Sequence, residues 1–156
     1  MEKTYNETLN IKDVGKTVTL CGWVAKKRDL GGLIFIDLRD RTGIIQLAFN
    51  PENKNYELAN SLKNEYVIKV IGKVVERTNK NTNIKTGDIE INVDYLEILN
   101  NCEELPFTIE DNTTALEDTR LKYRYLDIRR NKLKENLLLR AEILHFLRNK
   151  MYNFNS

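Results

Sequence analysis

The sequence predicts a mainly β fold, a small barrel of five strands with one short helix, followed by a hinge and a C-terminal amphipathic helix. Three observations support this prediction. Short segments rich in β-branched and aromatic residues fill most of residues 1–100. Clusters of glycine and asparagine separate these segments, as is typical of turns. One segment with helical spacing follows the third predicted strand.

Each predicted strand is bounded by turn residues. The first strand contains Gly22, and Gly31 and Gly32 form the turn that follows it. Residues 41–43 are a short hairpin connection, and the polar residues 78–87 predict a long mobile hairpin loop. The five strands are expected at residues 18–27, 33–40, 44–49, 66–77 and 88–99.

The order of these elements matches a Greek-key barrel of the OB type. Residues 55–64 carry Leu58, Ala59 and Leu62 at helical spacing, which predicts a short helix between the third and fourth strands. Three strands, a helix and two further strands is the order of the OB-fold. A glycine within the first strand fits, because that strand bends to join both sides of the barrel. A small meander or an SH3-like barrel is the alternative, and the inserted helix weighs against it.

The composition changes twice beyond the predicted barrel. Residues 101–118 contain six acids and no base, whereas residues 119–156 contain ten bases and three acids. The acidic stretch includes Pro106 and predicts a hinge. We therefore expect a barrel domain over 1–100, a hinge over 101–120 and the truncated start of another domain over 121–156. The amphipathic helix is predicted at 132–152 from the spacing of Leu133, Leu137, Ile143, Leu144, Leu147 and Met151.

The overall composition excludes several classes of protein. Hydrophobic residues make up 41% and charged residues 31%, as in soluble globular proteins. No apolar run reaches the roughly 18 residues of a membrane span, and the N-terminus lacks a signal or transit pattern, so we expect a cytoplasmic protein. Cys21 and Cys102 have no CxxC companion, which predicts reduced thiols. Without a nucleotide-binding loop, a Cys/His cluster or a nucleophile motif, no catalytic or metal site is predicted.

Strand periodicity places three functional candidates on the outer face of the barrel. Phe35, Gln46 and Glu90 alternate with apolar residues on the second, third and fifth strands, so they point away from the core. Lys69, Lys73 and Arg77 share one face of the fourth strand. The opposite, core-facing set is predicted to contain Ile34, Ile36, Leu38, Ile45, Leu47, Phe49, Ile89, Ile91 and Val93.

This outer face has the chemistry of a single-stranded nucleic-acid site. OB-folds bind oligonucleotides across their second and third strands and the adjoining loops. Phe35 offers a ring on which an unpaired base can stack, and the Gln46 amide can both donate to and accept from a base edge. The Glu90 carboxylate suits the N–H groups of guanine. The phosphates would be neutralised by Lys26, Lys27, Arg28 and Arg77.

Simpler interpretations of the same residues remain at this point. An outward phenylalanine is often covered by a neighbouring loop, and Glu90 can be an ordinary surface carboxylate. Lys69 and Lys73 can serve to keep an edge strand soluble. Trp23, beside the glycine of the first strand, is expected in the core.

Two segments resemble a known family. Residues 21–47, CGWVAKKRDLGGLIFIDLRDRTGIIQL, closely resemble the barrel signature of bacterial-type aspartyl-tRNA synthetases. Residues 121–130, LKYRYLDIRR, resemble the segment that joins the hinge to the catalytic domain of that family. Part of the first pattern is shared with asparaginyl- and lysyl-tRNA synthetases, but the residues of the two segments together favour the aspartyl enzymes. The likeness covers essentially the whole chain.

The resemblance implies that the barrel binds the anticodon loop of aspartate tRNA, a G-U-C triplet. Phe35 matches the aromatic residue that stacks on the central uridine, Gln46 the amide beside it, and Glu90 the acid that contacts the first-position guanine. Leu30 and residues 79–85 are where discrimination against asparagine tRNA would be sought. Further positions that match polar contacts to the anticodon stem and loop are Arg28, Arg77, Asn81 and Asn83.

Two departures from the family pattern bear on affinity. Val75 stands where some members carry an arginine, and Lys26 and Lys27 replace a common arginine pair. Lysine cannot make a bidentate contact to phosphate, so weaker binding is expected.

The family enzyme is a homodimeric class II ligase that uses ATP and Mg²⁺ to attach aspartate to tRNA. Its catalytic residues are expected downstream, because residues 131–154 match only the helix of the first class-defining motif. We therefore expect this chain to bind tRNA without charging it and to hold no cofactor itself. The alternatives are a free-standing OB module that binds nucleic acid and an OB barrel used for protein contacts.

Overall fold

The computed structural model describes residues 3–154. They divide between residues 103 and 104 into two compact units. The first unit contains the barrel and the second contains three helices. The assignment of a hinge to residues 101–120 and of a catalytic start to residues 121–156 stays a prediction.

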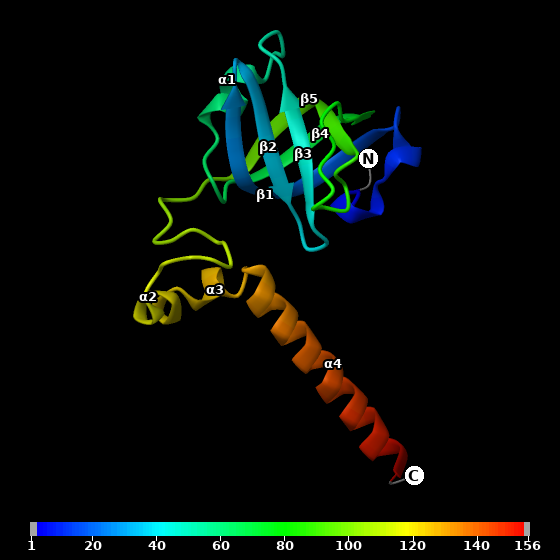
Figure 1. Cartoon of the computed structure of the whole chain (residues 1–156), viewed down its shortest axis with the longest axis vertical. Coiled ribbons are helices and arrows are strands. Elements are labelled where there is room, and N and C mark those ends of the chain that lie inside the picture. Colours follow the sequence, from blue (N-terminus) through cyan, green and yellow to red (C-terminus); the bar gives the residue numbers. More distant parts are fainter. Residues whose placement is uncertain (1–2, 155–156) are drawn as a thin grey trace. The chain divides into compact units, whose positions relative to one another are not determined.

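Five strands close into a barrel in the first unit (Figure 1). They hydrogen-bond in the order β1-β2-β3-β5-β4, and β4 closes on β1. Because β3 lies beside β5 rather than β4, the topology is not a meander, and the predicted OB-type barrel is confirmed. The helix α1 (Tyr56–Ser61) lies between β3 and β4 in sequence, as predicted. The strands are β1 (Thr17–Leu30), β2 (Leu33–Arg39), β3 (Ile44–Phe49), β4 (Val67–Glu76) and β5 (Ile89–Asn100).

The strand β1 belongs to both sides of the barrel. Its first half pairs with β4 from Thr17 to Trp23, and its second half pairs with β2 from Trp23 to Leu30. At the point of change, a Cβ on Gly22 would lie 2.3 Å from the carbonyl oxygen of Arg39. Only glycine therefore permits this close approach of two backbones.

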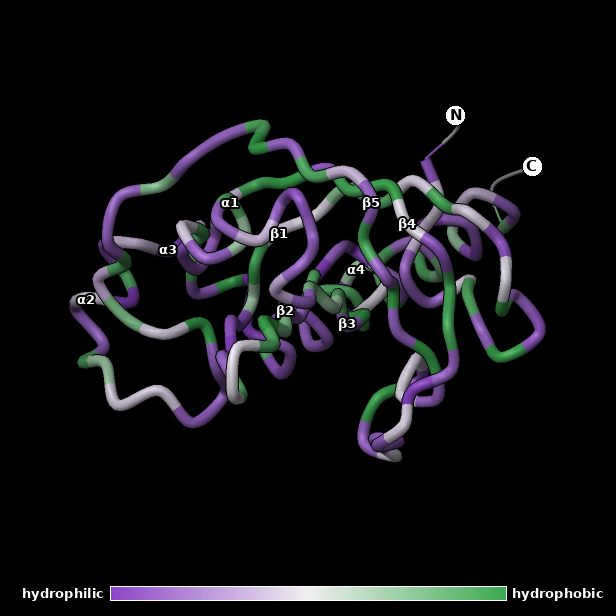
Figure 2. The backbone as a smooth tube through the Cα atoms, turned by 90° about the horizontal axis from the view of Figure 1, so that it is seen from above, coloured by the Kyte–Doolittle hydropathy of each residue, from purple (hydrophilic) through white to green (hydrophobic). Residues whose placement is uncertain are grey.

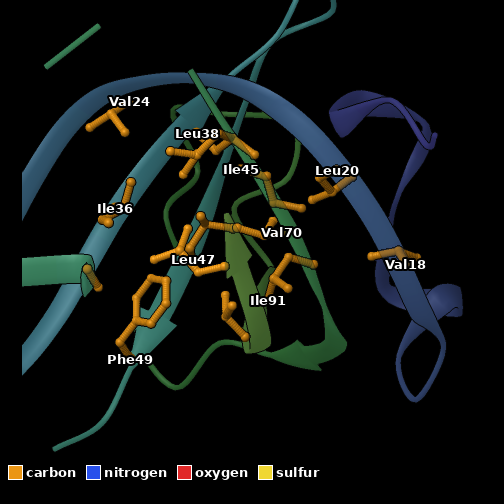
Figure 3. Packing of buried hydrophobic residues seen from close by; sticks show 14 of the residues in the cluster. Val18, Leu20, Val24, Ile36, Leu38, Ile45, Leu47, Phe49, Val70 and Ile91 are labelled. Carbon is orange, nitrogen blue, oxygen red and sulfur yellow. The ribbon is translucent and has the colours of Figure 1, made fainter. Parts of the chain in front are cut away.

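Apolar side chains from every strand meet inside the barrel. Figure 3 shows Leu38, Ile45, Leu47, Val70 and Ile91 pointing into one interior. All nine residues predicted to face the core are buried, and hydrophilic and hydrophobic stretches interchange along the chain, as half-buried strands require (Figure 2). Each fully buried aliphatic or aromatic side chain contributes about 1.5–3 kcal/mol.

The prediction that Trp23 is a core residue is wrong. Its neighbours Gly22 and Val24 are buried, whereas Trp23 is only half-buried. Alternation along β1 turns its side chain to the outside. The core instead includes Ala59 of α1 and Leu62, which directly follows this helix, and both are buried.

The interpretation of Lys69 and Lys73 as residues that protect an edge strand is also wrong. Their strand, β4, has a hydrogen-bonded neighbour on each side, β1 and β5. It therefore has no free edge. Lys69 instead lies 3.6 Å from the Glu97 carboxylate of β5.

The N-terminal segment is fastened to the hairpin between β2 and β3. Two 3₁₀ turns, η1 (Asn6–Thr8) and η2 (Ile11–Asp13), precede β1. The fully buried Asn6 donates its backbone N–H to Asp40 Oδ2 at 2.8 Å and its side-chain amide to the Leu38 carbonyl at 2.9 Å. Because Asp40 also accepts from the backbone of the hairpin turn, one carboxylate fixes both segments.

The loop between β4 and β5 is held by its own turns. The backbone N–H of Asn81 donates to the Gly87 carbonyl at 3.0 Å, and that of Gly87 donates to the Ile84 carbonyl at 3.1 Å. The buried Thr86 donates its hydroxyl to the Ile44 carbonyl at 2.5 Å, which ties the loop to β3. The segment predicted as a mobile loop is thus a chain of hydrogen-bonded turns in the structure.

The second unit is organised around a buried carboxylate. Asp127 accepts from Arg130 Nε at 2.7 Å and from Arg124 Nη1 at 3.1 Å. Asp111 accepts from the backbone N–H of Lys132 at 3.0 Å, which caps a helix start. The helices are α2 (Glu117–Lys122), α3 (Arg124–Asp127) and α4 (Asn131–Phe154).

The C-terminal helix is confirmed, and α2 was not predicted because it begins inside the expected hinge. No side chain of α4 is buried in the structure. Its exposed apolar residues extend beyond the predicted stripe, since Leu138, Leu139 and Phe146 are also exposed. Within residues 3–154, none of the helices is long and apolar enough to cross a membrane. Both cysteines are free thiols.

We expect Gly22→Ala to destabilise the barrel by about 3 kcal/mol or more, because the added Cβ meets backbone that cannot move aside. Gly31→Ala is the matched control. A Cβ there meets nothing within 4 Å, so only the cost of its positive φ of 65°, about 1 kcal/mol, is expected. Urea unfolding of the two variants measures both. Equal losses in the two variants would contradict the close approach.

Candidate nucleic-acid interface

A hollow of about 470 Å³ lies on the outer face of the barrel. Its walls come from the end of β1, the start of β2, the strands β3 and β5, the end of β4 and the start of the loop after β4. Six of the eight predicted site residues line it: Arg28, Leu30, Phe35, Gln46, Arg77 and Glu90. The structure therefore brings together side chains that are up to 62 positions apart in the sequence (28 to 90).

Strand register arranges the outward side chains of this face in two rows. The first row runs across the sheet through residues paired in register, Lys26–Asp37–Gln46–Glu90–Val75. Paired residues point to the same face, so the members of a row are neighbours in space.

The second row runs parallel to the first, one pleat along the strands. It consists of the register partners Arg28–Phe35–Ala48–Asn92–Lys73. Phe35 is half-buried and lies beside the small side chain of Ala48, and both line the hollow. Because alanine is small, it takes up little of the space beside the ring.

A chain of hydrogen bonds joins the two rows. Arg28 Nη2 donates to Asp37 Oδ1 at 2.5 Å and to Gln46 Oε1 at 3.3 Å. The Gln46 amide then donates through Nε2 to Glu90 Oε2 at 2.6 Å. Both ends of the Gln46 amide are engaged, so its orientation is set by its partners.

These contacts explain an unexpected burial. Gln46 was predicted to point outward and does so, yet only 5% of it is exposed. It lies between the carboxylates of Asp37 and Glu90, and Arg28 crosses from the other row to reach it. A buried amide is tolerated because each of its polar atoms has a partner.

Arg28 retains unused binding capacity. Its Nε atom is buried and has no hydrogen-bond partner in the structure. A buried donor without a partner costs about 1–3 kcal/mol. An acceptor on a ligand, such as a base carbonyl or a phosphate oxygen, would remove that cost.

The comparison with known families decides the class of this interface. Residues 18–99, more than half of the chain, match the tRNA anticodon family, described as an OB-fold nucleic acid binding domain. The chain belongs to this family. The matched OB-fold domain begins within β1 and ends within β5, so it contains both rows.

Relatives with known names extend the comparison beyond the OB-fold domain. The chain is 48% identical over 153 residues to an aspartate–tRNA ligase of Streptococcus thermophilus, an alignment that covers 96% of this chain and 26% of the ligase. It is 52% identical over 145 residues to an aspartate–tRNA ligase of Oceanobacillus iheyensis, an alignment that covers 90% of this chain and 24% of that ligase. The predicted resemblance to aspartyl-tRNA synthetases is confirmed, and the chain spans about a quarter of the length of these relatives.

Solved structures agree with this assignment. An asparaginyl-tRNA synthetase of Pyrococcus horikoshii, complexed with asparaginyl-adenylate, is 30% identical with a TM-score of 0.75, covering 92% of this chain and 34% of that one. The aspartyl-tRNA synthetase of Entamoeba histolytica superposes with a TM-score of 0.89 at 20% identity. This superposition covers 99% of this chain and 38% of that one. The second likeness supports the fold alone.

Two predicted site residues of this OB-fold domain lie outside the hollow. Asn81 accepts the backbone N–H of Asn83 at 3.0 Å through its side chain and so serves the turn of its own loop. Asn83 is exposed. Their contact with the anticodon stem and loop stays a prediction, while Thr78 and Asn79 from the same segment do line the hollow.

Sequence reasoning missed two other polar residues of the OB-fold face, Asp37 and Asn92. Asn92 lines the hollow, and Asp37 contacts Arg28. The signal was available for both, because Asp37 shares the parity of Phe35 and Asn92 shares that of Glu90. Across residues 3–154, no group of three or more His, Cys, Asp and Glu side chains is placed to hold a metal ion.

The surroundings of the Asp37 carboxyl make its ionisation unfavourable. Burial raises its pKa above the ordinary value of 3.8, while the charges of Arg28, Arg77 and Lys26 act in the opposite direction without cancelling the effect. The environment therefore disfavours the charged form, even though that form pairs with Arg28.

Asp37→Asn should change how stability depends on pH. A raised pKa in the folded state contributes stability that is present below the unfolded pKa and lost as pH rises through the folded value. Asparagine does not titrate, so the free energy of unfolding of the variant minus that of the wild type should increase from about pH 3 to about pH 7. Urea unfolding across this range measures the difference.

The matched control is Asp94→Asn, which removes an exposed carboxylate on β5. If the Asp37→Asn difference instead decreased with pH, the ion pair with Arg28 would outweigh burial.

Proposed function

We propose that this chain recognises the anticodon loop of aspartate tRNA as the anticodon-binding part of an aspartate–tRNA ligase. One observation carries the proposal: Arg28, Phe35, Gln46 and Glu90 meet in a single hollow of an OB-fold nucleic acid binding domain. The relatives that cover nearly the whole chain are aspartate–tRNA ligases.

The chemistry of the rows fits an unpaired triplet. The Phe35 ring stacks on a base, in this proposal the central uridine, and Ala48 beside it leaves room for the ribose or base. Glu90 has one oxygen bonded to Gln46 and a second oxygen free to accept from guanine N–H groups. Arg28 supplies its unpartnered Nε–H to an acceptor on the loop.

The phosphates of the RNA backbone are held by basic side chains around the hollow. Arg77 lines the hollow where β4 gives way to its loop, and Lys26 begins the first row. The Lys27 ammonium hydrogen-bonds to the Asn60 carbonyl, which directs it toward α1. Val75 ends the first row beside Glu90. Because valine is uncharged, this position does not help to neutralise phosphate. Binding should weaken as salt rises, in proportion to the phosphates neutralised.

The activity of the complete ligase is part of the proposal. In it, ATP with Mg²⁺ activates aspartate for transfer to tRNA in the cytoplasm, by a homodimer whose catalytic residues lie outside this chain. Asparagine tRNA, whose triplet differs from that of aspartate tRNA, is the second substrate to test, with Leu30 at the rim of the hollow as the residue to vary.

Binding of the chain to an anticodon stem-loop with a G-U-C triplet, against a loop of scrambled sequence, tests the recognition. We expect tighter binding to G-U-C and an affinity that falls with salt. Phe35→Ala should weaken the G-U-C complex by about 1–3 kcal/mol, the value of one base–aromatic stack. Fluorescence anisotropy at two salt concentrations measures both effects.

Tyr95→Ala is the matched control for the loss of Phe35, because Tyr95 is an exposed aromatic residue of β5 that does not line the hollow. Its affinity should be unchanged. If Phe35→Ala lowers the melting temperature and leaves the affinity of the folded molecules unchanged, Phe35 is a packing residue. Equal, salt-independent affinity for both loops would favour a barrel that serves protein contacts.

The second test concerns charging. Given ATP, aspartate, Mg²⁺ and tRNA, the chain alone should form no aspartyl-tRNA, because the proposal places the catalytic residues elsewhere in the ligase. The Streptococcus thermophilus ligase, assayed in parallel, is the positive control. Turnover of the chain above a reaction without protein would contradict this part of the proposal.

A further inference from the structure

We propose that Asp37 is a positioning residue that sets base specificity: it holds the Arg28 guanidinium away from Glu90, so that the Glu90 carboxylate stays available to a base edge. The inference rests on the proposed function of the hollow. It concerns a residue that contacts no base itself and acts through Arg28.

The geometry offers Arg28 two carboxylates. In the first row, Asp37 and Glu90 are the register neighbours of Gln46 on either side. Arg28 enters from the second row, where it faces Phe35, two positions from Asp37 on the same strand. Its Nη2 atom lies 2.5 Å from Asp37 and already reaches Gln46 at 3.3 Å.

Gln46 is the bridge between the two possible partners. It accepts from Arg28 through Oε1 and donates to Glu90 through Nε2. A guanidinium released from Asp37 has one carboxylate left within this row, Glu90. Arginine–carboxylate pairs are strong and often bidentate. Such a pair would occupy the oxygens that the proposal assigns to guanine.

Asp37 is otherwise hard to explain on this surface. A carboxylate beside a phosphate-binding site repels RNA, and burial disfavours the charge of this one. A residue that lowers the affinity for every RNA can still raise the difference between two RNAs, and specificity is that difference. When Asp37 is removed, we therefore expect tighter binding to a loop without the first-position guanine and poorer discrimination between the two loops.

Asp37→Asn tests this expectation, since asparagine keeps the shape and loses the charge. Two stem-loops are compared, G-U-C and A-U-C, which differ only in the first base. The ratio of their affinities should fall by about fivefold or more, the low end of one base contact, and affinity for A-U-C should rise. Asp37→Glu, which restores the charge, should recover the wild-type ratio at least in part.

The matched control is Asp94→Asn, which removes one acid from β5 away from the hollow. It should leave the ratio unchanged. Asp37→Ser, neutral and smaller, is measured beside Asp37→Asn so that a folding defect in one variant does not decide the result.

A double-mutant comparison separates positioning from a general charge effect. In a Glu90→Gln chain there is no carboxylate for Arg28 to occupy. Adding Asp37→Asn to Glu90→Gln should therefore leave the G-U-C to A-U-C ratio as it is in Glu90→Gln alone, a non-additive result. Additive losses would overturn the coupling between Arg28 and Glu90.

The outcomes distinguish this inference from the proposed function. If the wild type does not prefer G-U-C to a scrambled loop, the proposed function fails, and the role of Asp37 fails with it. If the wild type prefers guanine and Asp37→Asn keeps the same ratio, only the role of Asp37 is overturned. A loss of affinity for both loops by the same factor would mean that Asp37 supports the fold of the site rather than its specificity.

Discussion

Closure of the barrel through β1 is the constraint on which the rest of the structure depends. This strand pairs with β4 along its first half and with β2 along its second half, and Gly22 permits the approach at the change of partner. In a closed barrel each outward side chain has a fixed neighbour on both sides. The two rows follow from the strand register, which brings their members together from five separate strands.

The outward direction of Phe35, Gln46 and Glu90 could be predicted from the sequence, because each lies between buried aliphatic residues on a strand of period two. The burial of Gln46 could not. It depends on Arg28 reaching across from another strand, and no local pattern records such a contact. Asp37 was overlooked for the same reason: its parity was visible, but its partner was not.

Residues outside the alternating strands were harder to predict. Asn6 is polar and lies in an irregular segment, yet it is fully buried: its backbone N–H donates to Asp40 and its side-chain amide nitrogen donates to two carbonyls, while its Oδ1 atom has no partner in the structure. Asn81 in the loop after β4 shapes its own turn through its side chain, and the contact of Asn81 and Asn83 with RNA stays a prediction. Asparagine side chains can bond to nearby backbone as well as to a ligand, and sequence alone does not say which use prevails.

The register of the rows has a practical meaning for protein engineering. The two rows hold ten outward positions on five strands, seven of which line the hollow, and their side chains point away from a core that other residues fill. Randomising these ten codons would explore new ligands while leaving the apolar side chains inside the barrel unchanged. Conversely, the same ten side chains could be transplanted as one patch onto another barrel of equal register, carrying their mutual spacing with them.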